Sequence, residues 1–131
     1  MTKWIGILTN KKTKPMGLNT DLTYLSELAD GSNDFIIEMI EMFLDQTPNY
    51  LNQIDQYLQE KDWESIQGIA HAMKPSLSFM GIAALEPVVI SIEEKCMNQR
   101  ELDTIPGLIQ ELNQTCEVSY KELQEELTKL K

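Results

Sequence analysis

Residues 62–81 read DWESIQGIAHAMKPSLSFMG, and apolar side chains recur in this stretch at every third or fourth position. An α-helix turns by about 100° per residue, so this spacing gathers the apolar side chains into one stripe. The stripe consists of Trp63, Ile66, Ile69/Ala70, Met73, Leu77 and Met80. Asp62 is a suitable N-cap, and Gly81 suits the C-terminal stop. The segment therefore predicts one amphipathic helix with a buried face.

The same spacing recurs from residue 21 onward, and no segment alternates long enough to predict a β-strand. We expect further helices over about 22–28, from a Ser32 N-cap to about 58, over about 85–96 and over about 104–130. At Thr47-Pro48 the long helix either kinks, or Thr47 caps a new segment with Pro48 at its first position. Amphipathic helices with short connections bury their stripes against each other. The sequence thus predicts an all-α fold, an antiparallel four-helix bundle with a short extra N-terminal helix.

The composition excludes several classes of function. The 131 residues fit one domain, and 11 basic against 21 acidic residues give a formal charge of −10, which disfavours nucleic acid as a partner. One histidine and two cysteines are too few for a zinc finger, a His-rich metal cage or a disulfide framework. No apolar run approaches the ~18 residues of a membrane span. We expect a cytoplasmic protein with reduced thiols, in which Cys96 and Cys116 are small core residues.

Residues 1–20 differ in composition from the rest of the chain. They carry four of the 11 basic residues and no acidic residue, so all 21 acidic residues lie within 21–131. We interpret 1–20 as an N-terminal arm and 21–131 as the helical bundle domain. The apolar residues of the arm either attach it to the domain or belong to a flexible, frayed tail; they are Trp4, Ile5, Ile7 and Leu8.

The single histidine, His71, is predicted to lie off the buried stripe. On a helical wheel with Ile66 at the origin, the core positions cluster within about 40°, whereas His71 falls near ~140°. Gln67, Lys74 and Ser78 share its polar side. The outer side is unusual for a solvated helix because it carries small or apolar residues, namely Gly68, Ala72, Pro75 and Phe79. Small residues leave the imidazole accessible, and Phe79 either offers a docking contact or packs beneath a neighbouring helix.

The stretch from His71 to Gly81 resembles the signature of histidine phosphotransfer (HPt) domains, which is His-x-x-Lys-Gly followed by small residues and a later Gly. His71, Lys74, Ser76 and Gly81 match that pattern. Other runs also resemble the family, so that the resemblance covers roughly residues 20–100; they are Leu25…Leu28…Asp30-Gly31…Ile40…Phe43-Leu44 and Ile92-Glu93. Pro75 replaces the Gly after the Lys. A mid-helix proline removes the hydrogen bond to the carbonyl of His71, and we expect it to bend the helix there.

The resemblance implies a phosphocarrier of two-component phosphorelays. His71 would accept a phosphoryl group from a receiver-domain aspartate and pass it on, and Lys74 would offset the added charge. The candidate partner-binding residues on this side of the helix are Gln67, Gly68, Ala72, Pro75, Ser78 and Phe79. For Gln67 and Ser78 the other interpretation is an ordinary solvated side chain. The implied partners are receiver domains of response regulators or hybrid histidine kinases, with no nucleic acid, no membrane and a monomeric chain.

We expect this chain to need no cofactor of its own. Mg²⁺ would come with the partner receiver domain, because no acidic cluster in the sequence is placed to bind it beside His71. The chain has no Gly-rich phosphate loop, so we expect neither ATP binding nor autokinase activity.

Two other functions compete with the phosphocarrier for an all-helical chain of this size. A helical-bundle scaffold or adaptor would bind a partner without carrying phosphate, and it predicts that replacing His71, then an ordinary surface histidine, leaves function intact. A ferritin-like metal carboxylate enzyme needs Glu-x-x-His twice, whereas this chain has one histidine, with Gly68 three residues before it. The scaffold therefore stays as the alternative, and the metal enzyme is excluded.

Overall fold

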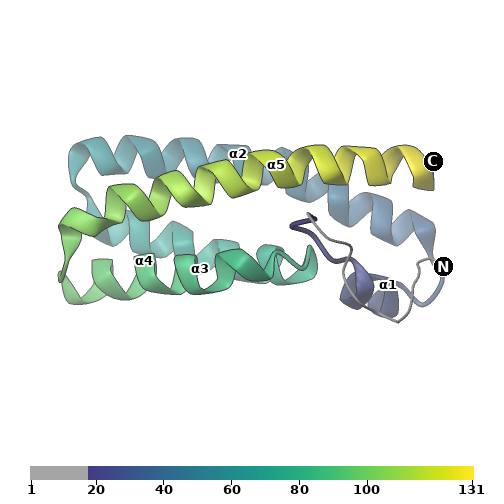
Figure 1. The fold of residues 1–131 in the computed structure, drawn as a ribbon, viewed down its shortest axis with the longest axis horizontal. Coiled ribbons are helices and arrows are strands. Elements are labelled where there is room, and N and C mark those ends of the chain that lie inside the picture. The colour runs from purple at the N-terminus through teal and green to yellow at the C-terminus, as the bar shows by residue number, and fades with distance from the viewer. Residues whose placement is uncertain (1–17) are drawn as a thin grey trace.

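A computed structural model describes residues 18–131, and within them the chain forms five α-helices (Figure 1). They are α1 (Thr23–Ala29), α2 (Asn33–Glu60), α3 (Trp63–Phe79), α4 (Glu86–Asn98) and α5 (Ile105–Leu130). Short 3₁₀ turns over Ala83–Leu85 and Leu102–Thr104 precede α4 and α5. The predicted attachment of the arm through Trp4, Ile5, Ile7 and Leu8 lies outside the described residues. No helix of the described part is long and apolar enough to cross a membrane.

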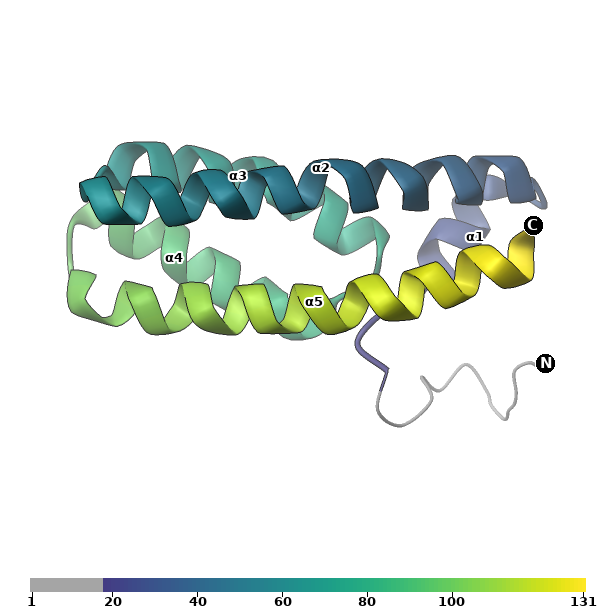
Figure 2. The same ribbon diagram turned by 90° about the horizontal axis from the view of Figure 1, so that it is seen from above.

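The four longer helices form the predicted bundle. α3 packs against α2 and α4, and α5 packs against the same two helices, which closes the ring. Figures 1 and 2 show α2 and α5 spanning the full length of the molecule, while α1 lies at the end that the shorter α3 and α4 leave open. The antiparallel four-helix bundle with a short N-terminal helix is thereby confirmed.

Most of the predicted stripe of α3 lies in the core, whereas Trp63 and Ile69 are partly buried and pack against it. Ile66, Ala70, Met73, Leu77 and Met80 are each at most 4% exposed. Cys96 and Cys116 are buried and unpaired with each other, as predicted. Burial raises the pKa of the Cys96 thiol to about 11 and that of Cys116 to about 12. Both thiols are therefore protonated at neutral pH and act as packing groups.

Helix boundaries follow the predicted caps. The hydroxyl of Ser32 accepts from the Phe35 N–H at 3.2 Å, and the carboxylate of Asp62 accepts from the Ser65 N–H at 3.2 Å. α2 runs without interruption across Pro48, so a new helix capped by Thr47 is wrong. Thr47 is 2% exposed, and the packing of this part of α2 outweighs the one hydrogen bond that Pro48 removes. α3 likewise continues through Pro75 to Phe79.

Helix α3 ends in a Schellman motif. The N–H of Ile82 donates to the Leu77 carbonyl at 3.0 Å, and that of Gly81 donates to Ser78 at 3.0 Å. Gly81 has φ +64°, the left-handed conformation that glycine adopts without strain. The N–H of Asp21 donates to the Met80 carbonyl at 3.1 Å, so the chain that leads into α1 rests directly on this turn.

A single carboxylate fixes the start of the described chain to α5. Glu122 accepts hydrogen bonds from the backbone N–H groups of Asn19 and Thr20 at 2.9 Å, and from both of their side chains at 2.9–3.2 Å. Burial opposes the charge on Glu122, but these hydrogen bonds together outweigh it and lower its pKa below the ordinary 4.5. The carboxylate is therefore ionised at neutral pH and holds residues 19–20 against the bundle.

Replacing Glu122 by glutamine should lower the free energy of unfolding by about 1–2 kcal/mol at pH 7, because charge-assisted hydrogen bonds become neutral ones. The folded-state pKa of Glu122 is the lower one, so its stabilisation is complete above pH 4.5 and is lost as pH falls through the folded-state value. Urea unfolding of both proteins should therefore converge at acid pH. Glu125→Gln, an exposed change on the same helix, is the control; an equal loss in the control, or a difference independent of pH, would contradict this role.

Candidate functional site

His71 lies on the exposed side of α3, as the helical wheel predicts. Its side chain is 69% exposed, and that of Lys74, one turn further along, is 38% exposed. Gly68, Ala72 and Pro75 are also exposed. The imidazole is thus open to a large partner, with no bulky side chain on the adjacent outer turns of the helix.

A buried carboxylate from α4 joins the two side chains. Glu93 is 11% exposed, and its Oε2 lies 2.7 Å from Nδ1 of His71. Its Oε1 lies 2.7 Å from Nζ of Lys74. An ionised carboxylate can only accept hydrogen bonds, so Nδ1 carries the proton in this contact. In the neutral imidazole the lone pair is then on Nε2.

The other predicted partner-binding residues divide into two groups. Ser78 is exposed and Gln67 is half-buried, and neither side chain makes a hydrogen bond within residues 18–131. Phe79 is half-buried and stacks on Tyr24 of α1, with ring centroids 6.0 Å apart and 11° between the planes. Met42 of α2 lies with Phe79 around a small hollow. Because Tyr24 and Met42 are themselves exposed, Phe79 belongs to an apolar surface on the α1–α2 side of α3.

The sequence model of the Hpt domain family matches residues 38–131. The chain belongs to this family. Its structure is similar to the crystal structure of histidine-containing phosphotransfer protein B from Pseudomonas aeruginosa PAO1, with a TM-score of 0.77 and 22% identity over 85% of this chain and 96% of that chain. No curated protein matches the sequence. Family membership gives this Hpt domain a histidine phosphotransfer role in phosphorelays, in which Hpt domains act as phosphocarriers and interact with receiver domains and histidine kinases.

The carboxylate of Glu93 in this Hpt domain is ionised at neutral pH. The hydrogen bond from Lys74 lowers the pKa of Glu93 most; burial opposes it, and the hydrogen bond from His71 lowers it further, leaving it below 4.5. Because the folded-state pKa is the lower one, the carboxylate contributes stability above pH 4.5, and this contribution is lost as pH falls through the folded-state value.

The helical pattern does not predict that Glu93 belongs to the site, and Ile92-Glu93 contributes only to the family resemblance. Its position 22 residues after His71 becomes a contact only when α4 packs on α3. The signal in the sequence is an acidic residue directly after Ile92, on a helix whose Ile92 and Cys96 are core positions. A carboxylate held this close to a core is rarely buried without a partner.

Replacing Glu93 by alanine should reduce phosphoryl transfer to this Hpt domain about 10-fold, the lower end of the loss seen when the partner that orients a metal-bound histidine is removed. Without the acceptor at Nδ1, the proton also populates Nε2. Glu93→Gln keeps an acceptor oxygen there and should retain the tautomer. ¹⁵N chemical shifts of the imidazole measure the tautomer directly; an unchanged tautomer and rate in the alanine variant would show that Glu93 does not position His71.

Proposed function

We propose that His71 is the phospho-acceptor and that Nε2 is the atom that carries the phosphoryl group. This proposal rests on the 2.7 Å contact between Nδ1 of His71 and the buried carboxylate of Glu93. Because Nδ1 is engaged, Nε2 is the free nucleophile, and the side chain that bears it is 69% exposed. The donor is the phosphorylated aspartate of a receiver domain, and a second receiver domain takes the phosphoryl group onward.

The transfer step balances without a base. The Nε2 lone pair forms the N–P bond, the P–O bond to the aspartate breaks, and the aspartate leaves as a carboxylate. The imidazole keeps its Nδ1 proton and becomes positively charged. Glu93 stabilises that charge, because its Oε2 already accepts from Nδ1. The reverse of the same step returns the phosphoryl group to another aspartate.

Lys74 supplies positive charge to the phosphoryl oxygens. Its ammonium group has three donors, of which Glu93 engages one at 2.7 Å. A side chain one turn from His71 can therefore remain paired with Glu93 and also donate to the phosphoryl group. Phosphoryl transfer depends mainly on positioning and on such charge neutralisation.

We also propose the following properties of the domain. The domain is a phosphocarrier without ATP binding or autokinase activity, and it works as a cytoplasmic monomer on receiver domains of response regulators or hybrid kinases. It needs no cofactor of its own, and Mg²⁺ is brought by the receiver domain. The alternative is a helical-bundle scaffold or adaptor that binds a partner without carrying phosphate.

The test is phosphoryl transfer from a panel of phosphorylated receiver domains. Radioactive phosphate from the receiver domain should appear on the chain as a label that is lost in acid and survives alkali. This stability pattern distinguishes phosphohistidine from a phosphoester and from an acyl phosphate. No label from a broad panel would favour the scaffold.

A further inference from the structure

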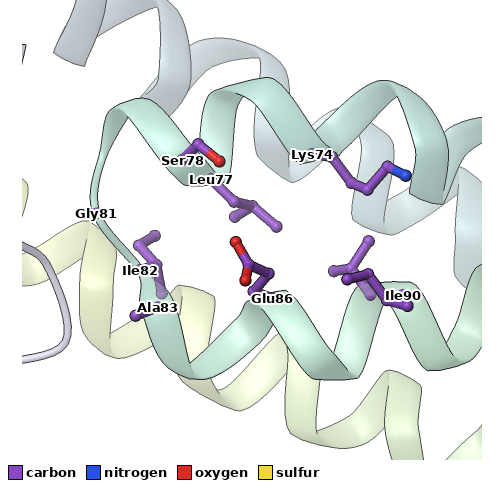
Figure 3. Close-up of a pocket in the computed structure, with 9 residues that line it drawn as sticks. Lys74, Leu77, Ser78, Gly81, Ile82, Ala83, Glu86 and Ile90 are labelled. Atoms are coloured by element: carbon purple, nitrogen blue, oxygen red, sulfur yellow. The ribbon is translucent and has the colours of Figure 1, made fainter.

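A groove between α3 and α4 begins at Lys74 and extends away from His71 toward Gly81. Its volume is about 300 Å³. Figure 3 shows side chains of the two helices facing each other across it, with the carboxylate of Glu86 directed from α4 toward α3. Leu77 and Ile82 form buried apolar walls, and Ile90 is a wall residue that is 38% exposed.

The groove lies on the opposite side of the His71 stripe from Phe79. On the helical wheel Lys74 falls near ~80° and Ser78 near ~120°, on one side of His71 at ~140°. Phe79 falls near ~220°, on the other side. Lys74 and Ser78 line the groove. The histidine is therefore flanked by two apolar surfaces, one shared by α1, α2 and α3 and the other shared by α3 and α4.

The groove is close enough to His71 for one partner to cover both. A stable protein interface buries about 800 Å² per partner, equivalent to a disc of about 16 Å radius. Ser78 is two turns beyond His71 on α3, about 10 Å along the helix axis. A receiver domain whose aspartate reaches Nε2 of His71 can therefore extend over the groove.

The charges at the groove define what it would accept. Glu86 is exposed and forms no ion pair with any residue of the 18–131 segment. Lys74, where the groove begins, already pairs with Glu93. Apolar walls beside an unpaired carboxylate fit an apolar side chain with a basic neighbour.

We propose that the α3–α4 groove is a docking site for the receiver domain, and that it takes an apolar side chain whose basic neighbour pairs with Glu86. This inference rests on the proposed function, because the receiver reaches the groove only when its aspartate is at His71. The groove adds a contact on the Lys74 side of the histidine, so its shape and charge select among receiver domains.

The test compares two phosphoryl donors on the full chain. Ile90→Lys should lower the second-order rate constant for transfer from a phosphorylated receiver domain about 10-fold or more, and should leave labelling by phosphoramidate, a small donor that needs no docking, unchanged. Val118→Lys is the matched control, since Val118 on α5 is 47% exposed, and it should behave as wild type with both donors.

A second variant tests the charge. Glu86→Lys should slow transfer from the receiver domain, and the slowing should shrink at high salt, whereas Glu111→Lys on α5 should have no effect. Wild-type rates in both groove variants would overturn the docking site. A groove variant that instead turns a dimer into a monomer would assign the groove to a second copy of the chain. No label on the wild-type chain from either donor would overturn the proposed function itself.

Discussion

Replacing His71 by glutamine is expected to abolish the acid-labile label completely, from receiver domains and from small donors alike. The chain contains one histidine, so no other imidazole can take the phosphoryl group. Glutamine has a similar reach and polarity but no nucleophilic lone pair. The measurement is label incorporation by the wild-type chain and the variant at equal concentration, over a time course that takes the wild type to completion.

The same variant should remain folded. The His71 side chain is 69% exposed, and its hydrogen bond within residues 18–131 is the one to Glu93. Its loss should change the free energy of unfolding by no more than about 1 kcal/mol, which urea unfolding and circular dichroism can establish. Label that persists in a folded variant would refute His71 as the acceptor, whereas label lost together with the fold would require a milder substitution such as asparagine.

The fold could be predicted largely from local patterns. The periods of three and four residues, with caps at Ser32 and Asp62 and the stop at Gly81, place α2 and α3 correctly because each feature depends on residues within one helical turn. At Pro48 the local signal allowed two outcomes. Burial of Thr47 against the rest of the bundle, which no local pattern contains, maintains one continuous helix.

The site could be predicted only in part, for the same physical reason. The exposure of His71 follows from its angle on one helix, so it could be predicted from the sequence. The partner that organises the site comes from another element, because Glu93 approaches from α4. The anchor of the first described residues is equally non-local, since Glu122 contacts Asn19 and Thr20, about 100 residues earlier in the chain. Such contacts depend on which helices become neighbours, and a single sequence read helix by helix does not contain that information.

Replacing Gly81 by alanine should lower the free energy of unfolding by about 2–4 kcal/mol, because two effects combine at this position. An alanine in the left-handed conformation costs about 1 kcal/mol. A Cβ at Gly81 would also overlap the carbonyl oxygen of Asp21, a backbone atom that cannot move without displacing the chain that leads into α1.

The chain offers a matched control that separates the two effects. Gly31 also has a positive φ, +87°, but a Cβ there would meet nothing within 4 Å. Gly31→Ala should therefore show the conformational cost alone, about 1 kcal/mol in urea unfolding. The amount by which Gly81→Ala lowers the free energy of unfolding more than Gly31→Ala measures the contact between the turn after α3 and Asp21. This contact joins the chain before α1 to the end of α3, so we expect the stacking of Tyr24 on Phe79 to be disturbed as well. Equal losses in the two variants would mean that the chain before α1 moves freely away from the turn, and that α1 is not held in place by it.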